Sequence, residues 1–415
     1  MAGIYGNQRT FLCTSSFPSR EHEDLEDKGG ISLKVGIIGI GIAGFRTTTP
    51  ELSWKELTYE AAAKAYQDAG VDPRKDVKAF VTCAEDYWEG FGIFDEFTPD
   101  QIGGALRPVC TVCGDGIHGL ATGFMQIQTG LVDVVAVEAH SKISDLLTYE
   151  GVVQHALDPI WNKPLRGHPF YVAGLEMNAF LRASGNTEKH CAAVVEKNRN
   201  NAMRNGIAAY GANVDLNDIL TSEKAFDPLK KLEISGLADG AVVLVLASDV
   251  AAKKLKRKPV WIKGVGWAND SPSLETREWE RAKYAELAAQ MAYRLAKVKN
   301  PAREIDFAEV DDRFSYKELQ HLESLGLAKK GQAGKMTANG DTALDGKFPV
   351  NASGGSLGCG DVVEASGLHR VAEVALQLRG DAGKRQLDGV KVGIAQSWRG
   401  IPTTSGAVAI MGVNQ

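Results

Sequence analysis

Residues 113–137 read CGDGIHGLATGFMQIQTGLVDVVAV, a stretch that joins a small polar turn to a helix pattern and a strand pattern. After the turn, apolar side chains recur at helical spacing, and Gly130 is placed to end the helix. Residues 132–137 then form a run typical of a strand buried on both faces. The stretch therefore predicts a tight turn, a helix and a buried strand in succession.

The same order recurs near the end of the chain. Cys359-Gly360-Asp361 repeats the first tripeptide, and residues 362–378 carry apolar side chains at helical spacing. Gly380 follows, and residues 390–395 again have the pattern of a strand. Each copy of the tripeptide is thus predicted to stand at the head of a helix.

A second correspondence lies upstream of each copy. Ala65-Tyr66 is followed by a proline and the apolar run 77–81, and Ala292-Tyr293 is followed by a proline and the apolar run 305–310. In both places the proline is expected to end a helix before a strand. We therefore predict a duplicated α/β fold, with helices between and outside two sheets and with its chemistry where two helix N-termini meet.

Composition limits the class of protein. The chain has 415 residues, 44% of them apolar, and its net charge of −5 comes from mixed signs, which does not favour a nucleic-acid surface. There is no bilayer-length apolar run and no signal-peptide pattern, and the six cysteines lack paired spacings. These features predict a cytoplasmic protein. Residues 1–34 are expected to form a polar arm or a disordered tail.

Cys113 is the candidate nucleophile. Gly114 and Gly116 permit a tight turn around it, and the N-terminus of the following helix favours a thiolate. Two other interpretations stay open. Cys113 is a small residue packed at a helix start, or it forms a redox pair with Cys110.

Four motifs in the same order resemble the thiolase superfamily, specifically the sterol-carrier-protein type thiolases, from about Val35 onward. Cys113-Gly-Asp-Gly is similar to the nucleophile motif, and Glu309-Val-Asp-Asp-Arg-Phe-Ser is similar to a segment that reads Glu-Val-His-Asp-Cys-Phe-Ser in relatives. Residues 351–367 resemble the loop and helix that carry the activating histidine. Residues 234–241 resemble the loop that touches coenzyme A.

The resemblance implies a thiolase-like fold with α/β/α/β/α layers. An N-terminal half is expected at 35–140 and 234–262, and a C-terminal half at 263–415. Residues 141–233 are expected to form an inserted loop domain that covers the coenzyme. Their length supports this independently, because so many residues are too long for a plain connection between strands.

The resemblance also implies ligands and partners. An acyl-CoA substrate and coenzyme A as co-substrate are expected, with Ser235, Gly236, Gly354 and Gly355 near the coenzyme. Relatives imply a homodimer core and a small partner protein with a zinc ribbon and an OB fold. The sequence has no cysteine quartet, so any structural zinc would belong to that partner, with no metal in this chain.

The sequence departs from the family where the acid and base groups are expected. Asp361 replaces the activating histidine, Asp311 replaces a histidine or asparagine, and residues 396–400 contain neither cysteine nor histidine. An aspartate has an ordinary pKa near 4, so burial or a second carboxylate would have to raise it before it could accept a thiol proton. The alternatives are an N-cap role for Asp361, an ion pair of Asp311 with Arg313, and activation of the thiol by the helix dipole alone.

Three other residues are candidates for the remaining steps. Cys359 is a possible second acid or base, or a packed core residue. His168, at the border of the inserted region, is a natural proton carrier near neutral pH. Backbone amides near Cys113 and in residues 353–355, with the side chain of Ser397, are expected to bind the oxyanion.

Aromatic residues and an arginine suggest the substrate. The stretch 87–94 is unusually aromatic, and Trp398 with Arg399 would suit an acyl group that bears a phenyl ring and a carboxylate. This pattern is similar to that expected of 2-benzoylsuccinyl-CoA thiolases, which belong to the β-oxidation of anaerobic toluene degradation and yield benzoyl-CoA and succinyl-CoA. Cys113 would then carry the acyl group before coenzyme A accepts it. Rival hypotheses are a non-catalytic acyl-CoA-binding subunit and a condensing acyltransferase.

Overall fold

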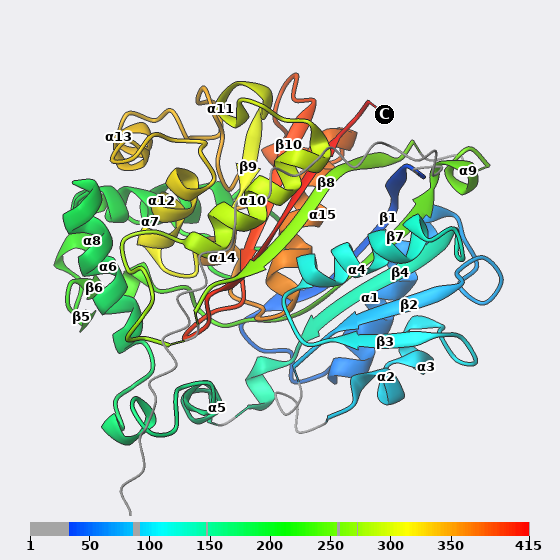
Figure 1. Ribbon diagram of the computed structural model, residues 1–415, viewed down its shortest axis with the longest axis horizontal. Helices are drawn as coiled ribbons and strands as arrows, with labels where there is room; N and C mark the ends of the chain where they lie inside the picture. The colour runs from blue at the N-terminus through cyan, green and yellow to red at the C-terminus, as the bar shows by residue number, and fades with distance from the viewer. Residues whose placement is uncertain (1–32, 86–91, 147, 255–257, 272, 415) are drawn as a thin grey trace, which may run out of the picture. The chain divides into compact units, whose positions relative to one another are not determined.

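A computed structural model describes residues 33–414, apart from 86–91, 147, 255–257 and 272. The strands of the N-terminal half are β1 (Val35–Arg46), β2 (Ala79–Cys83), β3 (Val109–Val112), β4 (Val134–Ser141) and β7 (Asp239–Ser248). Those of the C-terminal half are β8 (Val260–Asn269), β9 (Phe307–Glu309), β10 (Val392–Trp398) and β11 (Ser405–Gly412). They form one mixed sheet in the order β3-β2-β4-β7-β1-β8-β11-β10-β9 (Figure 1).

The helices follow the same division. In the N-terminal half they are α1 (Trp54–Ala69), α2 (Phe94–Phe97), α3 (Pro99–Ile102), α4 (Gly116–Gln128) and α9 (Asp249–Ala252). In the C-terminal half they are α10 (Lys283–Ala296), α11 (Pro301–Glu304), α12 (Ser315–Ser324), α13 (Ala333–Ala338), α14 (Gly355–Cys359) and α15 (Ala365–Arg379). The inserted region holds α5 (Tyr149–His155), α6 (Tyr171–Ser184), α7 (Glu188–Ala202), α8 (Leu216–Thr221), and the paired strands β5 (Lys224–Phe226) and β6 (Leu229–Lys230).

The layers confirm the predicted fold class. Helices α4 and α15 pack against each other and against strands of both halves, so they form a central layer. Helix α1 covers the other face of β1 and β7, and α10 covers the other face of β8 and β11. The apolar faces of α4 and α15 share one core with the inner faces of the strands, which includes Ile117, Leu120, Leu368 and Val371. The architecture is α/β/α/β/α.

The duplication is visible in the strand order. The N-terminal half runs β3-β2-β4-β7-β1. The C-terminal half runs from Val350, which bridges to β9 in parallel, through β9, β10 and β11 to β8. The prediction of two separate sheets needs one correction, because β1 and β8 pair at Gly36–Trp261 and Ile37–Val260. This short edge-to-edge pairing satisfies backbone groups that would otherwise be unpaired.

The second tripeptide does not stand where the sequence predicted. Cys359 is the last residue of α14, and α15 begins six residues later, at Ala365. Gly360 has a φ of 101° and ends α14, because this backbone conformation is open mainly to glycine. Only the first tripeptide directly precedes its helix.

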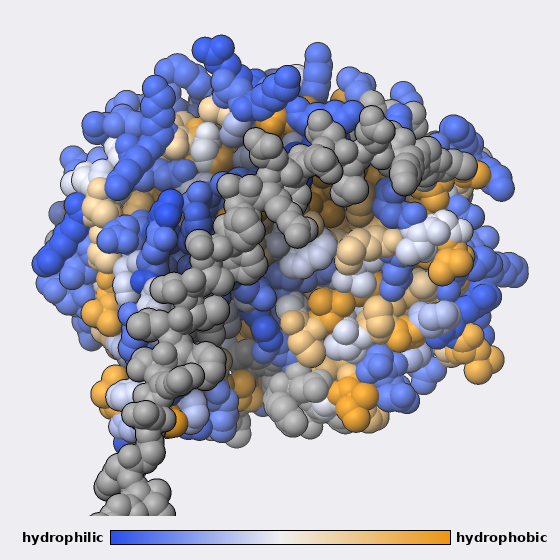
Figure 2. Space-filling view, viewed as in Figure 1, coloured by the Kyte–Doolittle hydropathy of each residue, from blue (hydrophilic) through white to orange (hydrophobic). Residues whose placement is uncertain are grey.

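The inserted region packs mainly on the C-terminal half, where α7 contacts α12, α13 and α14. On the face shown in Figure 2, hydrophobic side chains are more frequent over β3 and α4 than over α7 and α13. Leu106 on the segment before β3, Met125 on α4 and Leu131 after α4 are exposed. Most of the predicted arm and residues 87–91 of the aromatic stretch lie outside the described residues. In the described part of the chain, no helix has the length and apolar character that crossing a membrane requires.

Candidate active site

Cys113 lies in the turn between β3 and α4, and its side chain is exposed. β3 runs parallel to β2, so Cys113 follows the carboxyl end of a parallel strand. Ligand sites of α/β sheets form at such ends. The predicted nucleophile therefore stands at an accessible position, next to the N-terminus of a 13-residue helix.

The two helix N-termini meet, as predicted. Gly116 N on α4 donates to Glu364 O at 2.9 Å. The Asp115 carboxylate accepts from Ile117 N at 3.0 Å through Oδ1 and from Gly367 N on α15 at 2.9 Å through Oδ2. One buried aspartate therefore joins the two central helices. Burial raises the pKa of Asp115 to about 6.

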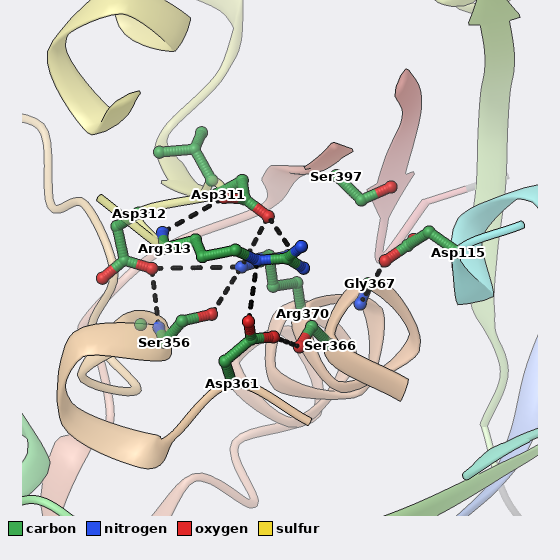
Figure 3. A network of polar contacts seen from close by, with 12 residues as sticks. Asp115, Asp311, Asp312, Arg313, Ser356, Asp361, Ser366, Gly367, Arg370 and Ser397 are labelled. Carbon is green, nitrogen blue, oxygen red and sulfur yellow. Dashed lines mark hydrogen bonds and ion pairs between the residues drawn. The ribbon is translucent and has the colours of Figure 1, made fainter. Parts of the chain in front are cut away.

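Five buried charged residues form an aspartate–arginine network beside Asp115 (Figure 3). They are Asp311, Asp312 and Arg313, after β9, Asp361, after α14, and Arg370, on α15. Arg313 Nε lies 2.9 Å from Asp361 Oδ2, and Arg370 Nη2 lies 3.1 Å from Asp311 Oδ2. Ion pairs therefore occupy the positions where the family resemblance implied histidines.

Asp361 is held by several donors at once. Besides Arg313, its Oδ1 accepts from Val363 N at 3.0 Å and from Ser366 Oγ at 3.1 Å. The contact with Val363 N shows a capping role, but for the turn that precedes α15 and not for the helix itself. The Asp361 carboxylate is thus engaged by one cation and by two hydrogen-bond donors.

The neighbouring aspartates differ in electrostatics. Burial alone would raise the pKa of Asp311, but Arg370 and Arg313 outweigh it, so this pKa lies below its usual value. Asp312 accepts from Ser356 N at 2.6 Å and Leu357 N at 3.2 Å, at the start of α14. Burial raises the pKa of Asp312 to about 7. Asp311 thus pairs most closely with Arg370, and it also contacts the Arg313 named from sequence, whose Nη2 lies 4.0 Å from Asp311 Oδ2 and whose N donates to Asp311 Oδ1 at 3.1 Å.

Cys359, Ser397 and Trp398 lie in the interior. The Cys359 thiol donates to Ser353 O at 3.1 Å, and burial raises its pKa well above the ordinary value, so the thiol stays protonated. Ser397 is buried beside Asp115 (Figure 3).

The position of Trp398 corrects a prediction. Its ring is 1% exposed, its Nε1 donates to Thr403 O at 2.9 Å, and Lys317 Nζ lies 4.2 Å from the ring centroid. The ring fills the core and is not a wall of a substrate cavity.

A cavity of about 730 Å³ lies beside the network. We call it the larger cavity, and its walls include Tyr149, His168, Phe170, Ser235, Leu237, Arg313 and Asp361. His168 Nε2 lies 2.8 Å from Glu150 Oε1, and its Nδ1 accepts from Phe170 N at 3.1 Å. The predicted residues His168, Ser235 and Asp361 therefore share one cavity, to which Arg313 adds a buried cation.

A cavity of about 140 Å³ lies on the other side of α5. This smaller cavity is lined by Asp115, Arg399, Glu85, Val363, Glu364 and Thr403, together with Val152, Val153, Ala156 and Ile401. Arg399 uses Nε and Nη2 in an ion pair with Glu85. Its guanidinium is thus directed to a carboxylate of the protein itself.

The glycines predicted to approach coenzyme A have structural roles. Gly236 O accepts from Asp361 N at 2.8 Å, and a Cβ at Gly236 would lie 2.2 Å from Tyr210. Gly354 and Gly355 have φ values of 104° and 59° at the start of α14, where Gly355 lies against Asp312. They line neither cavity described above.

Sequence reasoning missed Arg370 as a member of the site. The available signal was a charged residue between Leu368 and Val371, on a helix with a continuous apolar face. Arg370 also donates from Nη2 to Ser356 Oγ at 2.7 Å and so ties α15 to α14. In the described residues, no group of three or more His, Cys, Asp or Glu side chains is arranged to hold a metal ion.

Comparison with known proteins gives consistent matches. Residues 266–413 match a family described as thiolase C-terminal domain-like. An acetyl-CoA acetyltransferase of Methanothermobacter thermautotrophicus is 29% identical, and the match covers 91% of this chain and 98% of that protein. Sterol carrier protein 2 of Bos taurus is 29% identical over 87% of this chain and 69% of its own length. A solved structure described as an Ltp2-ChsH2(DUF35) aldolase has the same fold, with a TM-score of 0.79 and 23% identity over 91% of this chain and 97% of that one.

Proposed function

The chain belongs to the thiolase superfamily, and we propose that it cleaves a 3-oxoacyl-CoA with coenzyme A through an acyl-enzyme on Cys113. The observation that carries the proposal is the exposed thiol at the end of β3 and the N-terminus of α4. The Cys113 sulfur attacks the ketone carbon, and the carbon–carbon bond breaks so that its electron pair forms a thioester enolate. An acid protonates the enolate, and the sulfur of coenzyme A then takes the acyl group from Cys113.

Asp115 is the proposed proton carrier. It is two residues from Cys113, it lines the smaller cavity, and burial raises its pKa to about 6, close to the working range of an acid–base group. Asp361, which the sequence favoured, is held in an ion pair by Arg313. We assign Asp361 to the positioning of Arg313.

The proposed substrate bears both an aromatic ring and a carboxylate, as in the conversion of 2-benzoylsuccinyl-CoA and coenzyme A to benzoyl-CoA and succinyl-CoA. Tyr149 and Phe170 on the larger cavity support an aromatic acyl group, and Arg313 supports an anionic one. Aromatic rings gain from packing against other rings, and guanidinium groups match carboxylates.

The proposed assembly is a homodimer with a small partner protein. β3 is an edge strand, and the exposed Leu106 and Met125 lie on the segment before it and on α4. The aldolase described above consists of two named components, Ltp2 and ChsH2(DUF35), which supports a second component here. Light scattering would give the mass of the chain, and addition of the purified partner should change kcat or KM. A monomeric mass at the protein concentration of the activity assay would contradict the homodimer. Unchanged kcat and KM after addition of the partner would contradict the proposed partner.

The experiment is thiolysis of 2-benzoylsuccinyl-CoA by wild type, Cys113→Ala and Cys110→Ala, with products followed by mass spectrometry. Cys110 is the matched control, because it lies three residues away and its thiol accepts from Gln126 Nε2. Cys113→Ala should abolish turnover and the acyl adduct, whereas Cys110→Ala should keep both. An adduct elsewhere, or appreciable turnover by Cys113→Ala, would sink the assignment.

A cleavage without an acyl-enzyme is the second candidate. The observation that favours it is the engagement of Asp361, at the position of the family's activating histidine, in an ion pair with Arg313. The structural neighbour is described as an aldolase, which names such a reaction class for that protein. A Cys113→Ala variant that still cleaves the substrate, without any adduct in the wild type, would establish this candidate instead.

A further inference from the structure

Arg313 has donors that the protein does not use. Its side chain is on the wall of the larger cavity and is 4% exposed. Nε faces Asp361 at 2.9 Å, and Nη1 donates to Arg399 O at 3.4 Å. Nε, despite its ion pair, and Nη2 both have no hydrogen-bond partner among the described residues, and Nη2 lies 4.0 Å from Asp311 Oδ2.

A second unused donor lies on the same wall. Ser235 is 8% exposed, and its Oγ has no hydrogen-bond partner in the part of the chain that the structure describes. Ser235 N donates to Arg313 O at 2.9 Å, which fixes the two residues next to each other. Buried donors without acceptors are costly, and a ligand oxygen would remove that cost.

We propose that Arg313 and Ser235 bind a carboxylate carried by the acyl group, so that the chain selects acyl-CoA substrates that carry a free carboxylate in addition to the thioester. This inference rests on the proposed function. A guanidinium held from one side by Asp361 presents its remaining edge to a planar anion. Phe170 and Leu237 add apolar surface to the same cavity, and a less polar surrounding strengthens a hydrogen bond to a charged group.

The proposal moves the carboxylate site away from Arg399. That residue lies on the smaller cavity, and its guanidinium pairs with Glu85. Arg399 would have to break this ion pair before it could bind a ligand. Arg313 needs no such exchange, because its Nη2 has no hydrogen-bond partner among the described residues and the residue lines the larger cavity.

The test measures binding and not turnover. Isothermal titration of succinyl-CoA and butyryl-CoA, which share a four-carbon acyl chain, is carried out on Cys113→Ala protein. Succinyl-CoA should bind at least about tenfold tighter, as expected for hydrogen bonds to a charged group. Ser235→Ala in the same background should reduce the ratio of the two affinities severalfold. The substitution should leave the fold intact, because it removes only a hydroxyl without a hydrogen-bond partner among the described residues. The double substitution Arg313→Gln and Asp361→Asn in the same background removes both charges of the ion pair. It should bring the ratio of the two affinities close to one.

Arg399→Gln is the control and should leave the ratio unchanged. Equal losses for both ligands in Ser235→Ala would mean that this wall contacts the thioester or the coenzyme, and would overturn the proposal. If the ratio of the two affinities falls to about one in Arg399→Gln and in no other variant, the carboxylate binds at Arg399 and the proposal is wrong. If the double variant does not fold, Ser235→Ala decides alone. Discrimination by a protein that fails to cleave 2-benzoylsuccinyl-CoA would refute the proposed function and leave this site standing.

Discussion

The two buried aspartates of the repeated tripeptide have different surroundings. The two hydrogen bonds to Asp115 described above both come from backbone amides, whereas Asp361 also faces the guanidinium of Arg313. A charge buried without its counter-ion is far more costly than a lost neutral hydrogen bond. The two residues should therefore respond differently to the same substitution.

We predict that Asp361→Asn lowers the free energy of unfolding by about 3–5 kcal/mol, because it leaves Arg313 unpaired in the interior. Asp115→Asn should cost about 1–2 kcal/mol, since one amide acceptor remains. Urea unfolding of both variants measures this difference. Equal losses would show that Arg313 finds another partner and that the Asp361 pair contributes little.

The sequence located these residues without their partners. The repeated tripeptide singled out Asp115 and Asp361, of which Asp115 directly precedes α4 and Asp361 lies four residues before α15. It could not show that Arg313 points to Asp361 or that Arg370 reaches Asp311, since those contacts depend on the packing of α15 against the segment after β9. A buried ion pair between distant segments has no local sequence pattern.

At the scale of elements, the contact between α4 and α15 depends on glycine. A Cβ at Gly367 would lie 1.7 Å from Asp115 Oδ1, and a Cβ at Gly116 would lie 2.4 Å from Leu368 Cβ. The helices can therefore approach only because both positions lack a side chain. This close approach is what lets Asp115 accept from Gly367 N.

We predict that Gly367→Ala destabilises the protein by more than about 2 kcal/mol, because the helices must separate and Asp115 loses its second donor. Gly380→Ala, at the other end of α15, is the matched control. It has a φ of 79° and open space around it, so it should cost only about 1 kcal/mol. Thermal unfolding compares the two, and an equal or larger loss for Gly380→Ala would contradict the packing argument.

The elements themselves were largely predictable. Apolar periodicity located the strands β4, β7 and β10 and the helices α4 and α15, because all are buried on at least one continuous face. The division of residues 351–367 into α14 and α15 was not foreseen. It depends on the positive φ of Gly360 and on Asp312, which caps α14 from a distant segment.

At the scale of the whole molecule, the site forms only when both halves are folded. Cys113 and Asp115 come from the N-terminal half, and Arg313 and Asp361 come from the C-terminal half. Arg379 on α15 also pairs with Asp68 on α1 at 2.7 Å and so connects the halves at a distance from the site. Carboxyls that are buried only when the chain is folded change their pKa on unfolding, so their protonation is coupled to global stability.

The pKa shift of each buried group sets whether it raises or lowers the free energy of unfolding as pH rises. Burial raises the pKa of Glu309 to about 8 and that of Asp312 to about 7, whereas unfolded carboxyls titrate near 4. Between these values the folded chain holds protons that the unfolded chain has released, so stability falls as pH rises. Burial lowers the pKa of His118 to about 4 and that of His321 to about 3, which makes stability rise with pH, but only up to about 6.5.

We therefore predict that the free energy of unfolding decreases between pH 6.5 and pH 8, where the histidines no longer contribute and Glu309 and Asp312 still titrate. Urea unfolding at several pH values in this window measures the slope. Glu309→Gln should flatten it, because the amide cannot ionise and can still accept from Ser353 N, as Glu309 Oε1 does at 3.0 Å. Glu304→Gln, at an exposed position, is the control and should leave the slope unchanged. A stability that rises over this window in the wild type would show that Glu309 and Asp312 are ionised in the folded protein, held by their backbone donors more strongly than burial opposes.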